Sequence, residues 1–275
     1  MRPSLLRMAA LLVALAASGT VCGDGGASVA DLLNQALSAY DRGAELLPRD
    51  PQAARRSFSE SADLLQVLVD SGVRDGRVWY DLGNARLQSG MVGAAIHAYL
   101  EAERLIPTDP RVQANLAHAR TLRKDRIAES AATAASGLAA APRRVLAPRT
   151  RAWMTLAAWW LLWGLLALRL VRPALAPTSA IVVCAVLLAA LAATVALDFR
   201  FERGGDVGVL VADGVTVRKG NGASFEPAIE QQLSQGVEFD LLEHRGDWLR
   251  VRLPDGKEGW VRKDRAAIVG GLPDS

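Results

Sequence analysis

The side chains that could do chemistry in this chain of 275 residues are few and widely spaced. It has three histidines and two cysteines, and no set of them has the spacing of a metal site or of a nucleophile with its base. These residues are His97, His118, His244, Cys22 and Cys184. A glycine-rich loop of the phosphate-binding kind is also missing. The sequence therefore predicts a protein that is not an enzyme and that uses no metal or cofactor.

Two pairs of side chains could instead bind a ligand. Asn84 and Asn115 carry amides, which can hydrogen-bond both the N–H and the C=O groups of a peptide backbone. Trp248 and Trp260 carry flat aromatic faces that would stack on a peptide or a sugar, although tryptophans at such positions more often belong to the core or rim of a barrel. Which role each residue has depends on the elements that hold it.

Residues 28–128 read as a series of short helices, with apolar residues at helical spacing and Pro or Gly between them. Residues 76–109 form a 34-residue unit that resembles a tetratricopeptide repeat (TPR). The matching residues are Trp79, Leu82, Gly83, Gly90, Ala95, Tyr99, Ala102 and Pro107, and Arg86 departs from the family pattern. Weaker matches lie upstream, at Ala54, Phe58 and Ala62. We expect the downstream helix, residues 110–127, to cap the array, and an unrelated helical bundle is the alternative.

The resemblance also gives the two amides a position. In peptide-clamping TPR domains, amides at the positions of Asn84 and Asn115 face the concave groove and bind peptide. Tyr80 stands where the clamp has a lysine, which argues against a C-terminal carboxylate as the ligand. Asn is also common at both positions in TPRs that clamp nothing, so a purely structural role remains open.

Two apolar runs, residues 153–171 and 174–197, are each about 20 residues long, the length that crosses the hydrocarbon of a bilayer. A linker, residues 129–151, precedes them. Residues 130–197 contain six Arg and no acidic residue, so the positive charge of the chain belongs to this region and the remainder is net negative. Arginines there suit lipid headgroups, and we expect no nucleic-acid partner.

Residues 1–23 have the pattern of an export signal, with Arg2 and Arg7 before a short apolar run. Cys22 leaves lipidation open as an alternative to simple cleavage. The signal predicts that both soluble parts lie outside the cytoplasm. Six arginines would then flank the outer face against two inside, which is the reverse of the usual distribution. We follow the signal, because long domains are exported largely regardless of charge.

Residues 204–269 alternate as short strands between turn residues, which predicts a small all-β barrel. We expect strands at residues 208–212, 215–218, 238–243, 248–253 and 259–262, and a helical stretch at 227–235. The segment resembles a bacterial SH3 (SH3b) domain. Its matching stretches are Val215 to Gly222, Gly246 to Val251 and Asp255 to Val261, and Asn221 stands where the family often has Pro.

Signal, TPR hairpins, paired transmembrane helices and SH3b domain, in this order, resemble the BatE-type proteins of the Bacteroides aerotolerance (Bat) family. The resemblance implies a two-pass protein of the bacterial inner membrane, with von Willebrand factor A-domain Bat proteins and a MoxR-type AAA ATPase as partners. Two functions are expected from it and from the residues. One is a scaffold that recruits envelope proteins, and the alternative is a peptidoglycan-binding sensor that acts through the SH3b domain.

Overall fold

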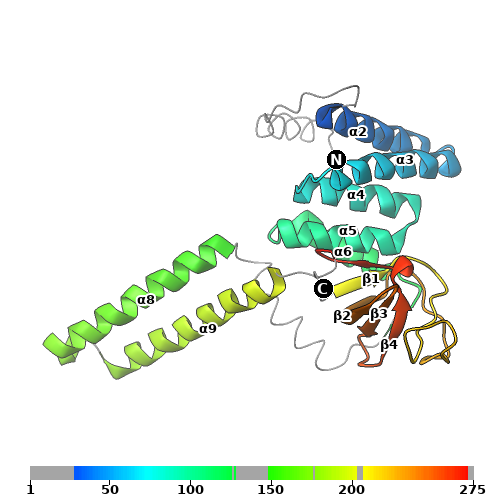
Figure 1. The fold of residues 1–275 in the computed structure, drawn as a ribbon. Helices are drawn as coiled ribbons and strands as arrows, with labels where there is room; N and C mark the ends of the chain where they lie inside the picture. The colour runs from blue at the N-terminus through cyan, green and yellow to red at the C-terminus, as the bar shows by residue number, and fades with distance from the viewer. Residues whose placement is uncertain (1–27, 126, 128–147, 176, 203–206, 272–275) are drawn as a thin grey trace. The chain divides into compact units, whose positions relative to one another are not determined.

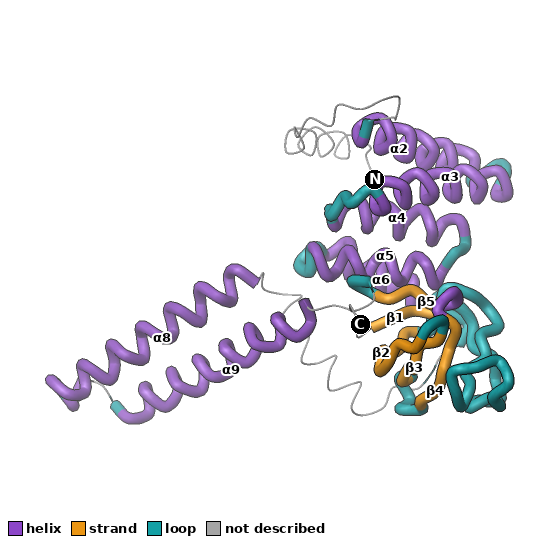
Figure 2. Tube along the Cα trace, viewed as in Figure 1, coloured by secondary structure: helices purple, strands orange, loops and turns teal. Residues whose placement is uncertain are grey.

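The computed structural model describes residues 28–125, 127, 148–175, 177–202 and 207–271 (Figure 1). The predicted export signal and most of the predicted linker lie outside these residues. The chain divides into two compact units after Arg74. The first unit contains helices α2 and α3. The second contains α4 to α6, the apolar helices α8 and α9, and a sheet that we call the β-domain, residues 207–271 (Figure 2).

The first unit is an antiparallel pair of helices, α2 (Val29–Leu46) and α3 (Pro51–Asp70). Ser28 and Asp31 form a capping box that starts α2, and Asp50 accepts backbone N–H groups at the start of α3. The helices pack closely because Gly43 has no side chain. A Cβ there would lie 2.8 Å from the ring of Phe58. The Phe58 ring in turn meets Tyr40 edge-on, with centroids 5.1 Å apart.

The same packing recurs in the second unit, between α4 (Gly76–Ser89) and α5 (Val92–Leu105). A Cβ on Gly83 would lie 2.5 Å from the ring of Tyr99, and the Tyr80 and Tyr99 centroids are 6.1 Å apart. Gly90 ends α4 with a φ of 92°, a conformation that favours glycine. The pattern of Tyr, Gly and an aromatic ring therefore marks two related helical hairpins.

Helix α6 (Pro110–Thr121) is shorter than the predicted range of residues 110–127. It was expected to cap the helical array, and this expectation is wrong. Its Leu116 and Ala119 share a buried cluster with α5 and with Val209 of the β-domain. The helical stack therefore continues into the sheet, and α6 lies inside that packing.

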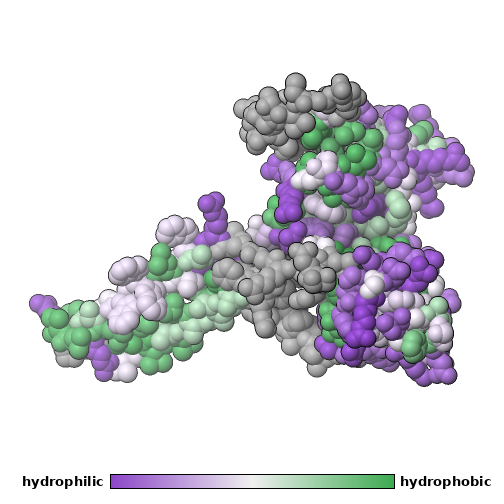
Figure 3. All heavy atoms as spheres, in the orientation of Figure 1, coloured by the Kyte–Doolittle hydropathy of each residue, from purple (hydrophilic) through white to green (hydrophobic). Residues whose placement is uncertain are grey.

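Two long apolar helices follow, α8 (Pro148–Val171) and α9 (Thr178–Glu202). Both are long and apolar enough to cross a membrane, and most of the face that Figure 3 shows is hydrophobic or neutral, with only a few hydrophilic side chains. Helix α8 starts earlier than the predicted span, because Pro suits the first turn of a helix. Helix α9 starts later, at Thr178, after a short helix η1 (Pro173–Leu175) that follows the first apolar helix. The two helices pack together, and Arg169 donates to Thr178 at 2.7 Å.

The β-domain is an antiparallel sheet with strand order β4-β3-β2-β1-β5. Its strands are β1 (Val207–Leu210), β2 (Glu238–Arg245), β3 (Trp248–Arg252), β4 (Glu258–Arg262) and β5 (Ala266–Ile268), and a short helix η2 (Lys263–Arg265) precedes β5. Its core is a cluster of buried aliphatic side chains with Phe239. Four of the predicted strands are confirmed within a few residues, and β5 was not predicted.

Two sequence predictions in this domain are wrong. The segment 215–218 is no regular strand, although Val215 exchanges backbone hydrogen bonds with Leu233. The segment 227–235 is not helical. Its backbone bonds instead to the chain around Val217, with Ala228 donating to the Val217 carbonyl at 2.8 Å. Tertiary pairing overrides the helical composition of this stretch.

Candidate functional site

The two predicted amides lie together in a polar cluster on the helices of the second unit. Asn115 on α6 donates from Nδ2 to the Asn84 Oδ1 on α4 at 2.8 Å and to the Tyr80 hydroxyl at 3.1 Å. The Tyr99 hydroxyl on α5 also donates to Asn84 Oδ1, at 2.9 Å. We call these four residues the amide cluster. It is held in place because the close approach of α4 and α5 at Gly83 brings the rings of Tyr80 and Tyr99 to the same region.

A charged group borders the amide cluster. The Arg111 guanidinium lies 5.5 Å from the centre of the Tyr80 ring, a cation–π contact. Arg111 also donates to both carboxylate oxygens of Asp109, and these hydrogen bonds lower the pKa of Asp109. Burial raises the pKa of Asp81 to about 7, against the opposing charge of Arg111. Sequence reasoning missed Arg111, whose only signal was its position four residues before Asn115.

The hydrogen bonds of the amide cluster leave groups for a ligand. Both N–H groups of Asn115 are used inside it, whereas the NH2 group of Asn84 and the Oδ1 atom of Asn115 have no partner among the described residues. A donor and an acceptor on two side chains that are bonded to each other can pair with the C=O and N–H groups of a peptide backbone. The cluster can therefore bind a peptide backbone, with no chemistry beyond hydrogen bonding.

The predicted tryptophans lie on neighbouring strands of the β-domain. Trp248 on β3 is opposite Arg262, and Trp260 on β4 is opposite Arg250. Because side chains alternate along a strand, both tryptophans project from one face of the sheet, while Leu249 lies on the buried face. We call the face with Trp248 and Trp260 the outer face.

The two tryptophans differ in exposure. Trp260 is only 8% exposed, and the Arg245 guanidinium lies 5.7 Å from its ring centre. Trp248 is half-buried, so part of its ring is open to a ligand. Arg245 also pairs with Glu243 at 2.7 Å. Trp248 on β3 and Arg245 at the end of the neighbouring strand β2 are therefore both accessible to a ligand.

Further ion pairs extend along the same face. Arg250 and Arg252 both bind the carboxylate of Glu258, at 2.9 Å each. Hydrogen bonds from Arg252, and then Arg250, lower the pKa of Glu258. Arg262 similarly pairs with Asp264 at 3.0 Å. The outer face thus offers guanidinium groups that are already arranged beside an aromatic ring and could pair with carboxylates of a ligand.

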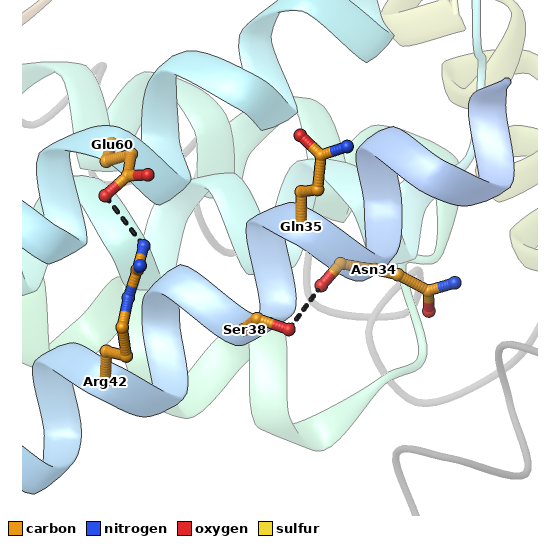
Figure 4. A pocket seen from close by; sticks show the side chains of 5 residues that line it. All are labelled: Asn34, Gln35, Ser38, Arg42 and Glu60. Carbon is orange, nitrogen blue, oxygen red and sulfur yellow. Dashed lines mark hydrogen bonds and ion pairs between the residues drawn. The ribbon is translucent and has the colours of Figure 1, made fainter. Parts of the chain in front are cut away.

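The first unit has a polar pocket of about 290 Å³ between α2 and α3 (Figure 4). It is lined by Asn34, Gln35, Ser38, Arg42 and Glu60. Ser38 donates to the carbonyl oxygen of Asn34 at 2.8 Å, and Arg42 pairs with Glu60 at the same distance. These side chains are largely exposed, and its two charged groups, Arg42 and Glu60, neutralise each other, so we do not assign a ligand to this pocket.

The histidines and the one described cysteine are dispersed. His97 on α5 has a side chain that is 13% exposed, His118 is exposed on α6 and His244 bonds to the Gly246 carbonyl at 2.7 Å. Cys184 is buried on α9, with its sulfur 3.6 Å from the Ala158 carbonyl.

Within the described ranges, no three His, Cys, Asp or Glu side chains are grouped to hold a metal ion. Sequence reasoning did miss one pair, His97 and Glu101, one turn apart on α5.

Comparison with known proteins identifies one part of the chain. Residues 213–265 match the family model described as "Bacterial SH3 domain", and this segment is a bacterial SH3 domain. A stretch of 53 residues is 34% identical to the Bacillus subtilis (strain 168) protein named "Putative N-acetylmuramoyl-L-alanine amidase YrvJ". The shared stretch is 19% of this chain and 10% of that protein. The similarity therefore concerns a single domain and not the whole chain.

Proposed function

We propose that this protein is a membrane-anchored binding protein of the bacterial envelope whose SH3 domain binds peptidoglycan. The observation that carries the proposal is the bacterial SH3 match over residues 213–265. Bacterial SH3 domains typically bind the cell wall. The name of the similar Bacillus protein points to N-acetylmuramoyl-L-alanine, the junction of sugar and peptide in peptidoglycan. Only the SH3 segment is shared, so the proposal is for binding and not for hydrolysis.

The proposed contact is the outer face of the β-domain. The open part of the Trp248 ring stacks on a sugar or on a peptide plane. Arg245, beside Trp260, pairs with a carboxylate of the stem peptide. The two apolar helices, which are long enough to span a bilayer, anchor the chain in the inner membrane. In this proposal, residues 1–23 direct the soluble parts to the outer side of that membrane.

The test is co-sedimentation of the full chain, in mild detergent, with purified peptidoglycan sacculi. We expect clear retention, at least tenfold less for Trp248→Ala, and recovery of most of it in Trp248→Phe, which keeps an aromatic face. Circular dichroism checks that both variants are folded. No retention of the wild-type chain above a protein without an SH3 domain would contradict the proposal.

A second function, protein scaffolding, is favoured by the unused amide groups of Asn84 and Asn115. In this proposal α2 to α6 are TPR hairpins and the amide cluster binds an extended peptide of an envelope protein. If the chain is of the BatE type, the partners are von Willebrand factor A-domain Bat proteins and a MoxR-type AAA ATPase system.

The scaffold is tested by purification from its own membranes in mild detergent. Co-purified proteins are compared between the wild type, the Asn84→Ala, Asn115→Ala double variant and Asn34→Ala, which changes an exposed amide on α2. We expect partners to be lost in the double variant only. Identical recovery from all three would exclude the amide cluster as the binding site.

A further inference from the structure

Helices α5 and α6 share a buried core with the β-domain, although α8 and α9 separate them in sequence. Val209 of β1 has no exposed surface and lies in one cluster with Ile96 and Tyr99 of α5 and Leu116 of α6. Beyond α6, Ile127 packs partly buried against the core of the β-domain. Apolar side chains buried between two elements are a stable contact and not a chance approach.

The backbone of α5 also comes very close to the β-domain. A Cβ on Gly93 would clash with the carbonyl oxygen of Leu210 and lie 2.9 Å from the amide nitrogen of Gly236. The Gly93 N–H donates to the side-chain oxygen of Gln235 at 3.1 Å. Only glycine allows this approach, at a helical position where most other residues would be preferred.

Two polar side chains of α5 that are largely removed from solvent find partners in the β-domain. His97 Nε2 lies 3.2 Å from the Ile268 carbonyl oxygen. The Glu101 side chain is 5% exposed and accepts hydrogen bonds from the Gly270 N–H and from Arg104. A buried carboxylate is costly unless it is paired. Glu101 would lose one of its partners if the β-domain moved away.

Ion pairs complete the interface at the end of α6. Arg120 donates to both oxygens of Glu238 on β2, at 2.8 and 2.6 Å, and Arg123 reaches the same carboxylate at 3.3 Å. Just after the helix, Asp125 accepts the Ser234 N–H at 2.6 Å. A bidentate arginine pair fixes the relative orientation of the two elements.

We propose that the β-domain is the cap of the helical stack, docked on α5 and α6 as one rigid body, and that this docking fixes both on the same side of the membrane. The membrane part rests on the proposed function. The path of the chain gives the reason, because α8 and α9 lie between α6 and β1. Elements that share a core are in one compartment, so the chain between them crosses the bilayer an even number of times. The shared core places both elements on one side independently of the export signal and of the arginine distribution, which predict opposite orientations.

The docking is tested by amide hydrogen exchange on the full chain in detergent. The N–H groups of Ser234 and Gly270 report on it, because both donate to carboxylates outside the β-domain. In Gly93→Val and in Glu238→Arg, we expect exchange at these two amides to be at least tenfold faster, while β3 and β4 stay protected. Arg120→Glu combined with Glu238→Arg should restore part of the protection.

The matched control is Glu258→Arg, which reverses an ion-paired carboxylate on β4, away from the interface. It should leave exchange at Ser234 and Gly270 unchanged. Unchanged exchange in both interface variants would overturn the docking.

The topology is tested with single cysteines in spheroplasts, at exposed Gln88 on α4 and exposed Lys257 in the β-domain, with Cys22 and Cys184 replaced by Ser. A membrane-impermeant maleimide should label both from the same side. Labelling from opposite sides would overturn the proposal. A chain that is soluble without detergent would contradict the membrane anchoring and the topology. The exchange measurement would then still show whether the β-domain is docked on α5 and α6.

Discussion

At the scale of single residues, the most informative groups are the ionisable ones that folding removes from water. Asp81 and His97 both lose solvent, and burial favours the neutral form of each. The consequences for stability have opposite signs, because one group is an acid and the other a base. Each gives a prediction that can be measured near neutral pH.

The pKa of Asp81 is raised to about 7 from an ordinary value of 3.8. Its contribution to stability is therefore complete below pH 3.8 and is lost as pH rises through 7. We expect Asp81→Asn, which cannot ionise, to stabilise the second unit at high pH by about 1–4 kcal/mol, and to matter little at low pH. Denaturant unfolding at several pH values measures this. Asp63→Asn, which removes an exposed carboxylate on α3, is the control and should leave the stability of the second unit unchanged.

Burial lowers the pKa of His97 from its ordinary value of 6.5, while the Ile268 carbonyl and the Glu101 carboxylate oppose this shift. The nearby charge of Arg86 lowers it slightly further. The stabilisation is present above pH 6.5 and is lost as pH falls through the lower folded-state value. We expect the protection of the Gly270 amide, its exchange rate relative to an unstructured peptide at the same pH, to fall on acidification in the wild type and much less in His97→Gln. An equal loss of protection in His97→Gln and in exposed His118→Gln would exclude His97 as the cause.

At the scale of elements, the helical hairpins depend on glycine at the crossing points. Gly83 lies against the ring of Tyr99 and Gly43 against that of Phe58. Alanine is the better helix former by about 1 kcal/mol, so propensity alone would favour replacing both glycines. The close packing of the aromatic rings opposes this.

We expect Gly83→Ala to destabilise the second unit by about 1–3 kcal/mol, because the new methyl group overpacks the Tyr99 ring. Thermal unfolding followed by circular dichroism measures the loss. Gly164→Ala on α8 is the matched control, since nothing lies within 4 Å of the added Cβ, and it should not lower the unfolding temperature. A Gly83→Ala variant as stable as the wild type would show that Tyr99 can move aside.

At the scale of the whole molecule, the two apolar helices and the rest of the chain are stable in different surroundings, the helices in lipid and the rest in water. Side chains such as Trp160, Leu170 and Val171 are exposed on α8. Such a surface is unfavourable in water and favourable in lipid. The docked β-domain, in contrast, needs only its contacts with α5 and α6.

Replacing residues 148–202 with a flexible Gly/Ser linker should therefore give a chain that is soluble without detergent. The reason is that the large exposed apolar surface is gone while the interface of α5, α6 and the β-domain is kept. Fractionation by ultracentrifugation measures the change, and exchange at Ser234 and Gly270 checks the interface. A replaced chain that still needs detergent would show that the apolar helices are not what makes the chain insoluble in water.

The sequence alone predicted the features that depend on local pattern. Helix boundaries follow capping residues and glycines such as Asp50 and Gly90, and the apolar runs of α8 and α9 are visible in composition. The motifs around Trp248 and Trp260 predicted the SH3 domain that the family match confirms. Each of these signals lies within a few tens of residues.

Only the tertiary structure decided how distant segments meet. Gly93 packs against Leu210, and Glu101 binds the Gly270 amide, across more than one hundred residues with no periodicity to reveal them. The segment 227–235 has a helical composition, yet its backbone N–H groups bond to a distant strand-like segment. Burial and hydrogen bonding between remote parts of the chain outweigh local propensity there, because a buried polar group must find its partner wherever the fold supplies one.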